Sequence, residues 1–158
     1  MKQKSHILPI IILTQFACTS TWFAGNAILE SLATTLDLGG GIIGYVLSSV
    51  QFGFILGTLL FGILMVADRY SPARVFMICA FLASLSNLCL IFPNLNLSGL
   101  IIARFSTGFF LAGIYPIGMK IAADYYKKGL GKALGFLVGA LVLGTAFPFL
   151  INGTLLGD

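Results

Sequence analysis

The stretch that decides the fold is IIGYVLSSVQFGFILGTLLFGILMV, residues 42–66, followed directly by ADRYSPAR, residues 67–74. The first part contains no Asp, Glu, Lys or Arg, and about 20 apolar residues are enough for a helix to cross the hydrocarbon core of a bilayer. The second part carries Asp68, Arg69 and Arg74. Because cationic residues collect in the cytoplasmic loops of membrane proteins, these two segments predict a transmembrane helix that ends at a cytoplasmic loop.

The rest of the chain repeats this pattern. Hydrophobic residues make up 58% of the 158 residues and charged residues only 9%, whereas about a quarter of the residues of a soluble domain are charged. Apolar segments predict five transmembrane helices, over residues 7–29, 42–66, 75–92, 99–122 and 133–151. We therefore predict an all-α integral membrane protein, with one partial transmembrane domain over residues 1–158.

The basic residues orient these helices. All but one lie at the N-terminus or around the loops that follow the second and fourth helices: Lys2, Lys4, Arg69, Arg74, Lys120, Lys127, Lys128 and Lys132. This distribution predicts a cytoplasmic N-terminus and a chain that ends outside after the fifth helix. We assign the net charge of +4 to topology and to anionic lipid headgroups, and expect no nucleic acid partner.

Polar side chains within the predicted helices are candidate functional residues, because they are costly in hydrocarbon unless they face protein or water. In the first helix they recur at intervals of four, three and four residues, which places them on one face. We interpret the strongest candidates as the lining of a central cavity: Gln15, Trp22, Asn26, Gln51, Arg104 and Tyr115. Interhelical hydrogen bonds that only hold the bundle together are the alternative, which is favoured for Thr19 and Ser20.

Arg104 is the basic residue that lies outside the cationic clusters, about one to two turns into the fourth helix from its outer end. A guanidinium stays protonated and needs an anion, carbonyl groups or water, and inserting it at a helix centre costs about 2.5–3.5 kcal/mol. We predict that Arg104 binds an anionic group of a substrate or modulates a nearby carboxylate. Snorkelling toward the outer headgroups is the alternative for Arg104, and the favoured interpretation for Lys120.

Glycines predict where helices cross closely, since small residues let backbones approach each other in lipid. Gly53 and Gly57 lie four residues apart in the second helix, and Gly131, Gly135 and Gly139 form one stripe at the start of the fifth.

The sequence offers no basis for catalysis. His6 is the single histidine, and neither a metal-ligand cluster nor a phosphate-binding loop is present in the sequence. We therefore expect no enzyme activity, no metal and no cofactor, and any transport would use an ion or solute gradient.

Two motifs resemble those of the major facilitator superfamily. Residues 67–74 resemble its loop G-x-x-x-D-R-x-G-R-R: Asp68, Arg69 and Arg74 fit, whereas Leu64 and Ser71 stand where the two glycines are expected. In the fourth helix, RFSTG at residues 104–108 resembles the motif R-x-x-x-G, and GIYPIGMK at residues 113–120 resembles a bacterial branch of the family.

This resemblance implies that the five helices form most of the N-terminal six-helix half of a secondary active transporter in the bacterial inner (plasma) membrane. The first and fourth helices would line the cavity, and Asp68, Arg69 and Arg74 would form a gating loop in which Asp68 meets a partner across the two halves. The expected partners are the lipid bilayer, an unidentified small solute, and a missing C-terminal half or a second copy. Proton-coupled drug efflux and a non-transporting scaffold or truncated relic are the alternatives.

Overall fold

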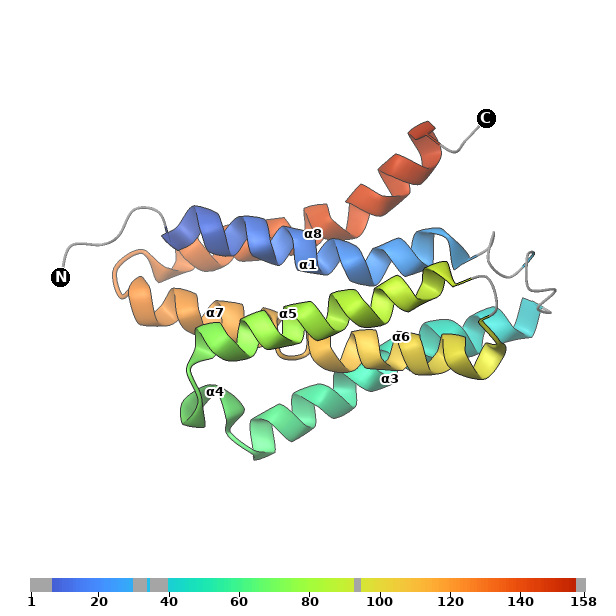
Figure 1. The fold of residues 1–158 in the computed structure, drawn as a ribbon. Coiled ribbons are helices and arrows are strands. Elements are labelled where there is room, and N and C mark those ends of the chain that lie inside the picture. The colour runs from blue at the N-terminus through green and yellow to red at the C-terminus, as the bar shows by residue number, and fades with distance from the viewer. Residues whose placement is uncertain (1–6, 30–33, 35–39, 93–94, 156–158) are drawn as a thin grey trace.

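A computed structural model describes residues 7–29, 34, 40–92 and 95–155 of the chain (Figure 1). In these residues the chain is helical and contains no β-strand. Its elements are α1 (Ile7–Ala27), α3 (Gly40–Ile63), α4 (Val66–Arg69), α5 (Pro72–Leu88), the 3₁₀ helix η1 (Cys89–Ile91), α6 (Leu97–Leu111), α7 (Tyr115–Tyr125) and α8 (Leu130–Leu155). Five spans in the described part are long and apolar enough to cross a membrane, which confirms the predicted all-α membrane fold.

The long helices run alongside one another and form two closely packed pairs (Figure 1). α3 packs along α6, and α1 packs along α8, while α5 lies against α6, α7 and α1. Both halves of the fourth span, α6 and α7, therefore contact α5 as well as α1. The fourth span is also the most buried of the five, because half of the residues in its apolar stretch are buried inside the bundle.

The single helix expected over residues 99–122 is in fact two helices. α6 ends at Leu111 and α7 begins at Tyr115. Pro116 has no N–H to donate to the carbonyl of Ala112, so the regular helical bond is lost at this point. The break is buried against α5 and α3, because a β-carbon at Gly113 would lie 3.0 Å from Cβ of Cys79 on α5 and 2.6 Å from Cε2 of Phe61 on α3. Irregular backbone at membrane depth is tolerated where protein covers it.

The loop expected over residues 67–74 also contains helical structure. α3 ends at Ile63, Met65 adopts a left-handed conformation with φ 50°, and the short helix α4 follows. Pro72 then starts α5 at a position where its missing N–H costs no helical bond. The segment is therefore a turn, a short helix and a second turn, which holds Asp68 and Arg69 in a defined place.

Glycines explain why α3 and α6 lie so close together. A β-carbon at Gly57 would lie 2.5 Å from the carbonyl oxygen of Phe109, and one at Gly108 would lie 2.8 Å from the carbonyl carbon of Val50. The close crossing predicted at Gly53 and Gly57 is thus confirmed. In contrast, β-carbons at Gly131, Gly135 and Gly139 would meet nothing within 4 Å, so this stripe makes no close crossing with the described chain.

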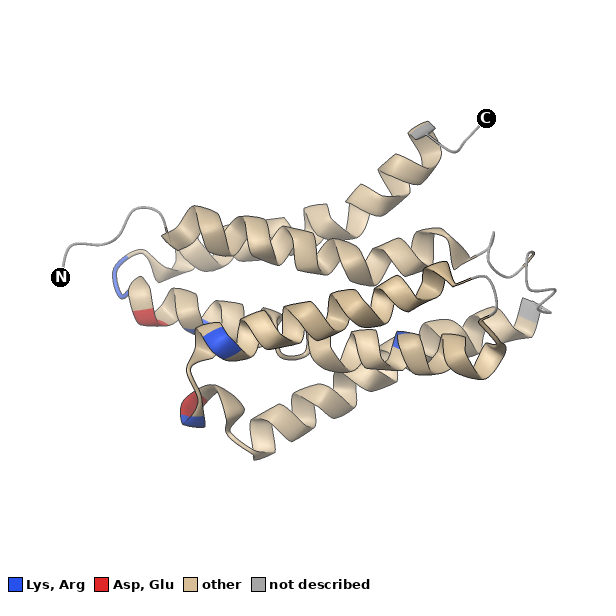
Figure 2. Cartoon of the chain, viewed as in Figure 1, with Lys and Arg blue, Asp and Glu red and all other residues tan. Residues whose placement is uncertain are grey.

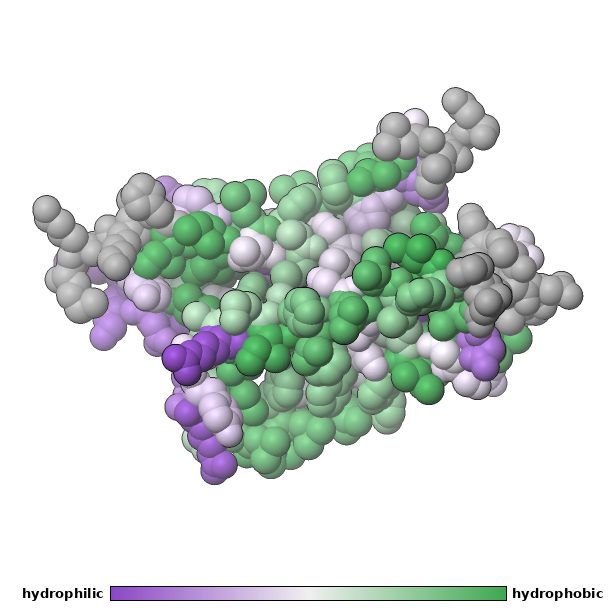
Figure 3. Space-filling view, in the orientation of Figure 1, coloured by the Kyte–Doolittle hydropathy of each residue, from purple (hydrophilic) through white to green (hydrophobic). Residues whose placement is uncertain are grey.

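The charges gather at one end of the bundle (Figure 2). The blue and red segments of the described chain lie on α4, at the start of α5, on α7 and around the turn into α8, with Arg104 on α6 as the exception. Along the sides, large apolar side chains are exposed, as the green surface in Figure 3 shows. A surface of this kind suits lipid along the sides and water at the end that carries the charges, which we call the cationic end.

Candidate functional site

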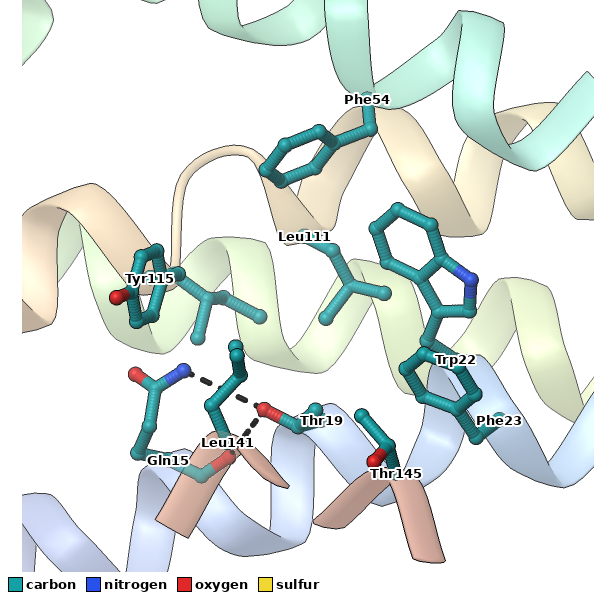
Figure 4. Close-up of a pocket in the computed structure, with 10 residues that line it drawn as sticks. Gln15, Thr19, Trp22, Phe23, Phe54, Leu111, Tyr115, Leu141 and Thr145 are labelled. Atoms are coloured by element: carbon teal, nitrogen blue, oxygen red, sulfur yellow. Dashed lines mark hydrogen bonds between the residues drawn. The ribbon is translucent and has the colours of Figure 1, made fainter. Parts of the chain in front are cut away.

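A cavity of about 330 Å³ lies inside the bundle, at the level of the break between α6 and α7 (Figure 4). We call it the central cavity. Its walls come from α1, α3, α6, α7 and α8, and its lining residues are Gln15, Thr19, Trp22, Phe23, Phe54, Leu111, Ile114, Tyr115, Leu141 and Thr145. The break contributes directly, because Leu111, Ile114 and Tyr115 surround it.

Gln15 and Thr19 are buried polar side chains of this cavity, with 1% and 5% of their surfaces exposed. Nε2 of Gln15 donates a hydrogen bond to Oγ1 of Thr19 at 3.4 Å, and that hydroxyl donates to the backbone carbonyl of Gln15 at 2.8 Å (Figure 4). Oε1 of Gln15 has no hydrogen-bond partner among the described residues. A β-carbon at Gly118 would lie 3.0 Å from this oxygen, so the glycine leaves it room on α7.

Aromatic rings form much of the remaining wall. The indole of Trp22 meets the ring of Phe54 edge-on at 5.2 Å between centroids and stacks on Phe23 at 5.9 Å. Tyr115 stands on the same side of the cavity as the Gln15 amide in Figure 4. None of the ten lining residues carries a charged side chain. The wall of the cavity is therefore aromatic and aliphatic, with a few polar atoms.

Arg104 lies next to the cavity and does not line it. Its side chain is 0% exposed, and Nη1 donates to the backbone carbonyl of Trp22 at 3.2 Å while Nη2 donates to Oδ1 of Asn26. Nε has no partner in the described part of the chain, where the guanidinium also forms no ion pair. Gly25 makes the approach feasible, since a β-carbon there would lie 2.9 Å from Cζ of Arg104. The guanidinium thus ties α6 to α1, and it does not snorkel.

The predicted cavity residues divide into three groups. Gln15, Trp22 and Tyr115 line the central cavity, and Asn26 instead binds Arg104. Gln51 lies on the exposed side of α3, outside the cavity lining.

Sequence reasoning missed the contribution of α8. Leu141 and Thr145 line the cavity, and Thr145 Oγ1 donates to the carbonyl of Val142 at 2.7 Å. A lone threonine that bonds to its own helix gives no signal of a site.

An ion pair occupies the cationic end. Nζ of Lys120 on α7 contacts Oδ1 of Asp68 on α4, so Lys120 has a partner in this chain instead of snorkelling. Arg69 and Arg74 are exposed and form no ion pair with residues that the structure describes. The pair joins the loop after α3 to the half of the broken span that lies at the cationic end.

Comparison with known proteins gives one match. A family model described as Major Facilitator Superfamily matches residues 10–158, which include four of the five apolar spans in full and the first span from residue 10 onward. No curated protein and no solved structure was found to match the chain.

Proposed function

Because the chain belongs to the Major Facilitator Superfamily, a family of membrane transporters, we propose that it is the N-terminal portion of a secondary active transporter for a small solute. In this proposal the solute crosses by alternating access, as the bundle rocks against a second half of the transporter or a second copy of the chain. The central cavity is this chain's share of the solute site.

The observation that carries the proposal is the central cavity itself. Polar and aromatic groups from helices far apart in the sequence meet in one cavity of a bundle whose outer surface is apolar. An amide such as Gln15 is expensive to hold within a membrane protein, and one of its polar atoms is left without a partner among the described residues. A scaffold that only spans the membrane has no need of such a cavity.

We further propose that Asp68, Arg69 and Arg74 form a gating loop at the cationic end. Support comes from the contact between Asp68 and Lys120, which links the loop to α7, and from the break that separates α7 from α6. α7 can tilt relative to α6 more easily than one half of an uninterrupted helix could, since the break lacks a regular hydrogen bond at Pro116. Movement of the loop would then reach Tyr115 at the cavity.

The proposed setting is the bacterial inner (plasma) membrane, with the cationic end in the cytoplasm. The cluster of Lys and Arg at that end supports this orientation.

Export of apolar compounds in exchange for protons is a second candidate, favoured by the aromatic wall of Trp22, Phe23 and Phe54. Proton coupling requires a titratable group within the membrane. The acidic side chains that the structure describes are Asp68 and Asp124. Both lie toward the cationic end, on α4 and in the last turn of α7. Proton-coupled export would therefore need an acidic group from outside the described residues.

Flux in proteoliposomes tests the proposal. The product of the complete gene, reconstituted in liposomes, is expected to move at least one class of small solute when a proton or sodium gradient is imposed. Neutral, anionic and cationic solutes form the panel, and liposomes without a gradient are the control. If no solute moves under any gradient, transport is refuted and the scaffold interpretation holds.

A further inference from the structure

We infer that one exposed face of α3 packs against a transmembrane helix in the second half of the transporter, and that Gln51 forms a hydrogen bond with a polar side chain of that helix. The inference rests on the proposed transport function and deepens it, because it names the surface that meets the second half. We call this face the α3 seam, and its residues are Gly44, Ser48, Gln51, Ile55, Thr58 and Gly62.

Gln51 carries the inference, because it is an exposed amide in the middle of a membrane span. It lies halfway along α3 (Gly40–Ile63), and its side chain makes no hydrogen bond with the residues that the structure describes. An amide without a partner is costly in hydrocarbon. The other side-chain amides of the described spans are buried or half-buried, namely Gln15, Asn26, Asn87 and Asn152. Gln51 therefore points out of the bundle at a depth where acyl chains cannot satisfy it.

The spacing of the α3 seam is that of a helix that packs on a second helix. Its residues recur at two positions in every seven: Gly44, Gln51 and Thr58 at one position, and Ser48, Ile55 and Gly62 at the other. This repeat keeps one face of a helix against a partner in a left-handed crossing. All of these residues are exposed, and β-carbons at the two glycines would meet nothing within 4 Å. In lipid, small residues allow such a close approach, and Gln forms hydrogen bonds across the contact.

A different face of α3 suits lipid. All residues of the α3 seam except Ser48 are followed directly by a large exposed apolar residue: Tyr45, Phe52, Leu56, Leu59 and Ile63. One position along a helix corresponds to a rotation of about 100°. The helix thus presents its large apolar side chains on one flank and its small and polar ones on the seam. Lipid covers the flank, and the seam remains for protein.

The position of the central cavity identifies the second half of the transporter as the occupant. Phe54, which lines the cavity, precedes Ile55 by one residue and lies about 100° from it, on the side opposite to the large exposed residues. A helix on the α3 seam therefore stands next to the cavity and adds a wall to it. Thr58 and Gly62 also line a smaller cavity of about 210 Å³, together with Pro116 at the break. A partner that covers the seam extends the solute site, which is the role proposed for the second half.

Photo-cross-linking of the complete gene product in lipid nanodiscs identifies the occupant. p-Benzoylphenylalanine is placed at position 55 in place of Ile55 on the seam, or at position 52 in place of Phe52 on the lipid-facing flank as the matched control. We expect the label at position 55 to join a transmembrane span of the second half in the same molecule, and the label at position 52 to join lipid. Mass spectrometry of the digested product distinguishes the adducts. Lipid adducts at both positions, or a cross-link between two copies, overturn the inference.

Replacing the amide gives a second result that does not depend on the label. In Gln51→Met, which has a similar shape and no amide, loss of an interhelical hydrogen bond is expected to raise the equilibrium constant for unfolding about threefold to thirtyfold. An amide that faces lipid predicts a change of the opposite sign, because hydrocarbon solvates the thioether better.

Ser84→Ala is the matched control for this measurement. Ser84 is exposed on α5 and its hydroxyl has no hydrogen bond within the described chain, so its removal should leave the constant unchanged or lower it. A Gln51→Met protein that is as stable as the unaltered one, or more stable, overturns the inference, also where position 55 gives no adduct.

The two proposals fail separately. Lipid adducts at position 55, together with flux of a solute in proteoliposomes, refute the seam and leave transport standing. A cross-link from position 55 to the second half, with no flux of any solute, supports the seam and refutes transport.

Discussion

Nη1 of Arg104 lies 3.2 Å from the backbone carbonyl oxygen of Trp22, so a guanidinium of α6 holds the turn of α1 that carries an aromatic wall of the central cavity. The second contact, to Asn26, lies one turn further along α1. Both contacts are made behind the cavity wall, because Arg104 is fully buried and is not part of the lining. The charge therefore acts on the shape of the cavity wall.

Replacing Arg104 by Lys should destabilise the protein while keeping its charge. A lysine ammonium cannot reproduce the planar fork that reaches two acceptors, and an unsatisfied buried partner costs about 1–3 kcal/mol. We expect a free energy of unfolding lower by that amount, measured by circular dichroism during denaturation of the purified protein. Arg74→Lys is the matched control, since Arg74 is exposed and the change should stay within about 0.5 kcal/mol. Equal effects of the two substitutions would contradict the structural role of Arg104.

Two glycine substitutions should have opposite effects on the free energy of unfolding. An alanine at Gly108 would force α3 and α6 apart, because its β-carbon would lie 2.8 Å from the carbonyl carbon of Val50. We expect a loss of about 1–3 kcal/mol from overpacking. Gly135→Ala has nothing within 4 Å and should gain about 0.5–1 kcal/mol from the lower conformational entropy of the unfolded chain.

The same unfolding measurement compares these two glycine variants. A Gly135→Ala protein as unstable as Gly108→Ala would show that this face of α8 is packed against something outside the described chain. That result would contradict the exposure of Gly135 in this structure.

The ion pair between Asp68 and Lys120 should matter for transport more than for stability. Side-chain exposure of 56% for Asp68 and 32% for Lys120 leaves the pair open to solvent, and exposed pairs contribute about 0–1 kcal/mol. We expect Asp68→Asn to lower the initial rate of uptake several-fold in proteoliposomes, with little change in unfolding. The exchange Asp68→Lys with Lys120→Asp should restore part of the rate, because it restores the attraction.

Asp124→Asn separates this effect from a general loss of negative charge. Asp124 is an exposed acid in the last turn of α7 and forms no ion pair with the described residues. We expect it to keep the rate of the unaltered protein. Uptake that falls equally in both acidic variants would assign the effect to charge at the cationic end and not to the contact between Asp68 and Lys120.

The sequence predicted the helices and the cationic end because both depend on properties that are local along the chain. Apolar length identifies a span, and the position of Arg69, Arg74 and Lys127 identifies one end. The number of spans and the gathering of described charges at one end follow from these properties alone. Neither needs knowledge of which helices touch.

The lining of the cavity could not be predicted in the same way. Gln15 and Gln51 are the same amide in two similar apolar helices, yet one is 1% exposed and the other lies on the surface. The difference follows from Gly53, which faces α6 at close contact. Gln51 precedes it by two residues, about 200° around the helix, and therefore points away from the bundle. Only the packing of α3 on α6 decides that Gln51 lies on the surface and not in the cavity.

Straightening the break should slow transport without unfolding the protein. In Pro116→Ala the new N–H can donate to the carbonyl of Ala112, which extends α6 toward α7 and removes the weak point beside Tyr115. We expect a lower initial rate of uptake and an equal or higher free energy of unfolding, because a helical bond is gained. Pro148→Ala is the matched control: Pro148 is also inside a helix, near the end of α8, and lies outside the central cavity lining. A rate unchanged in Pro116→Ala would show that α7 does not move relative to α6 during the cycle. A fall in both proline variants would show that helix flexibility in general, and not the break at the cavity, limits the rate.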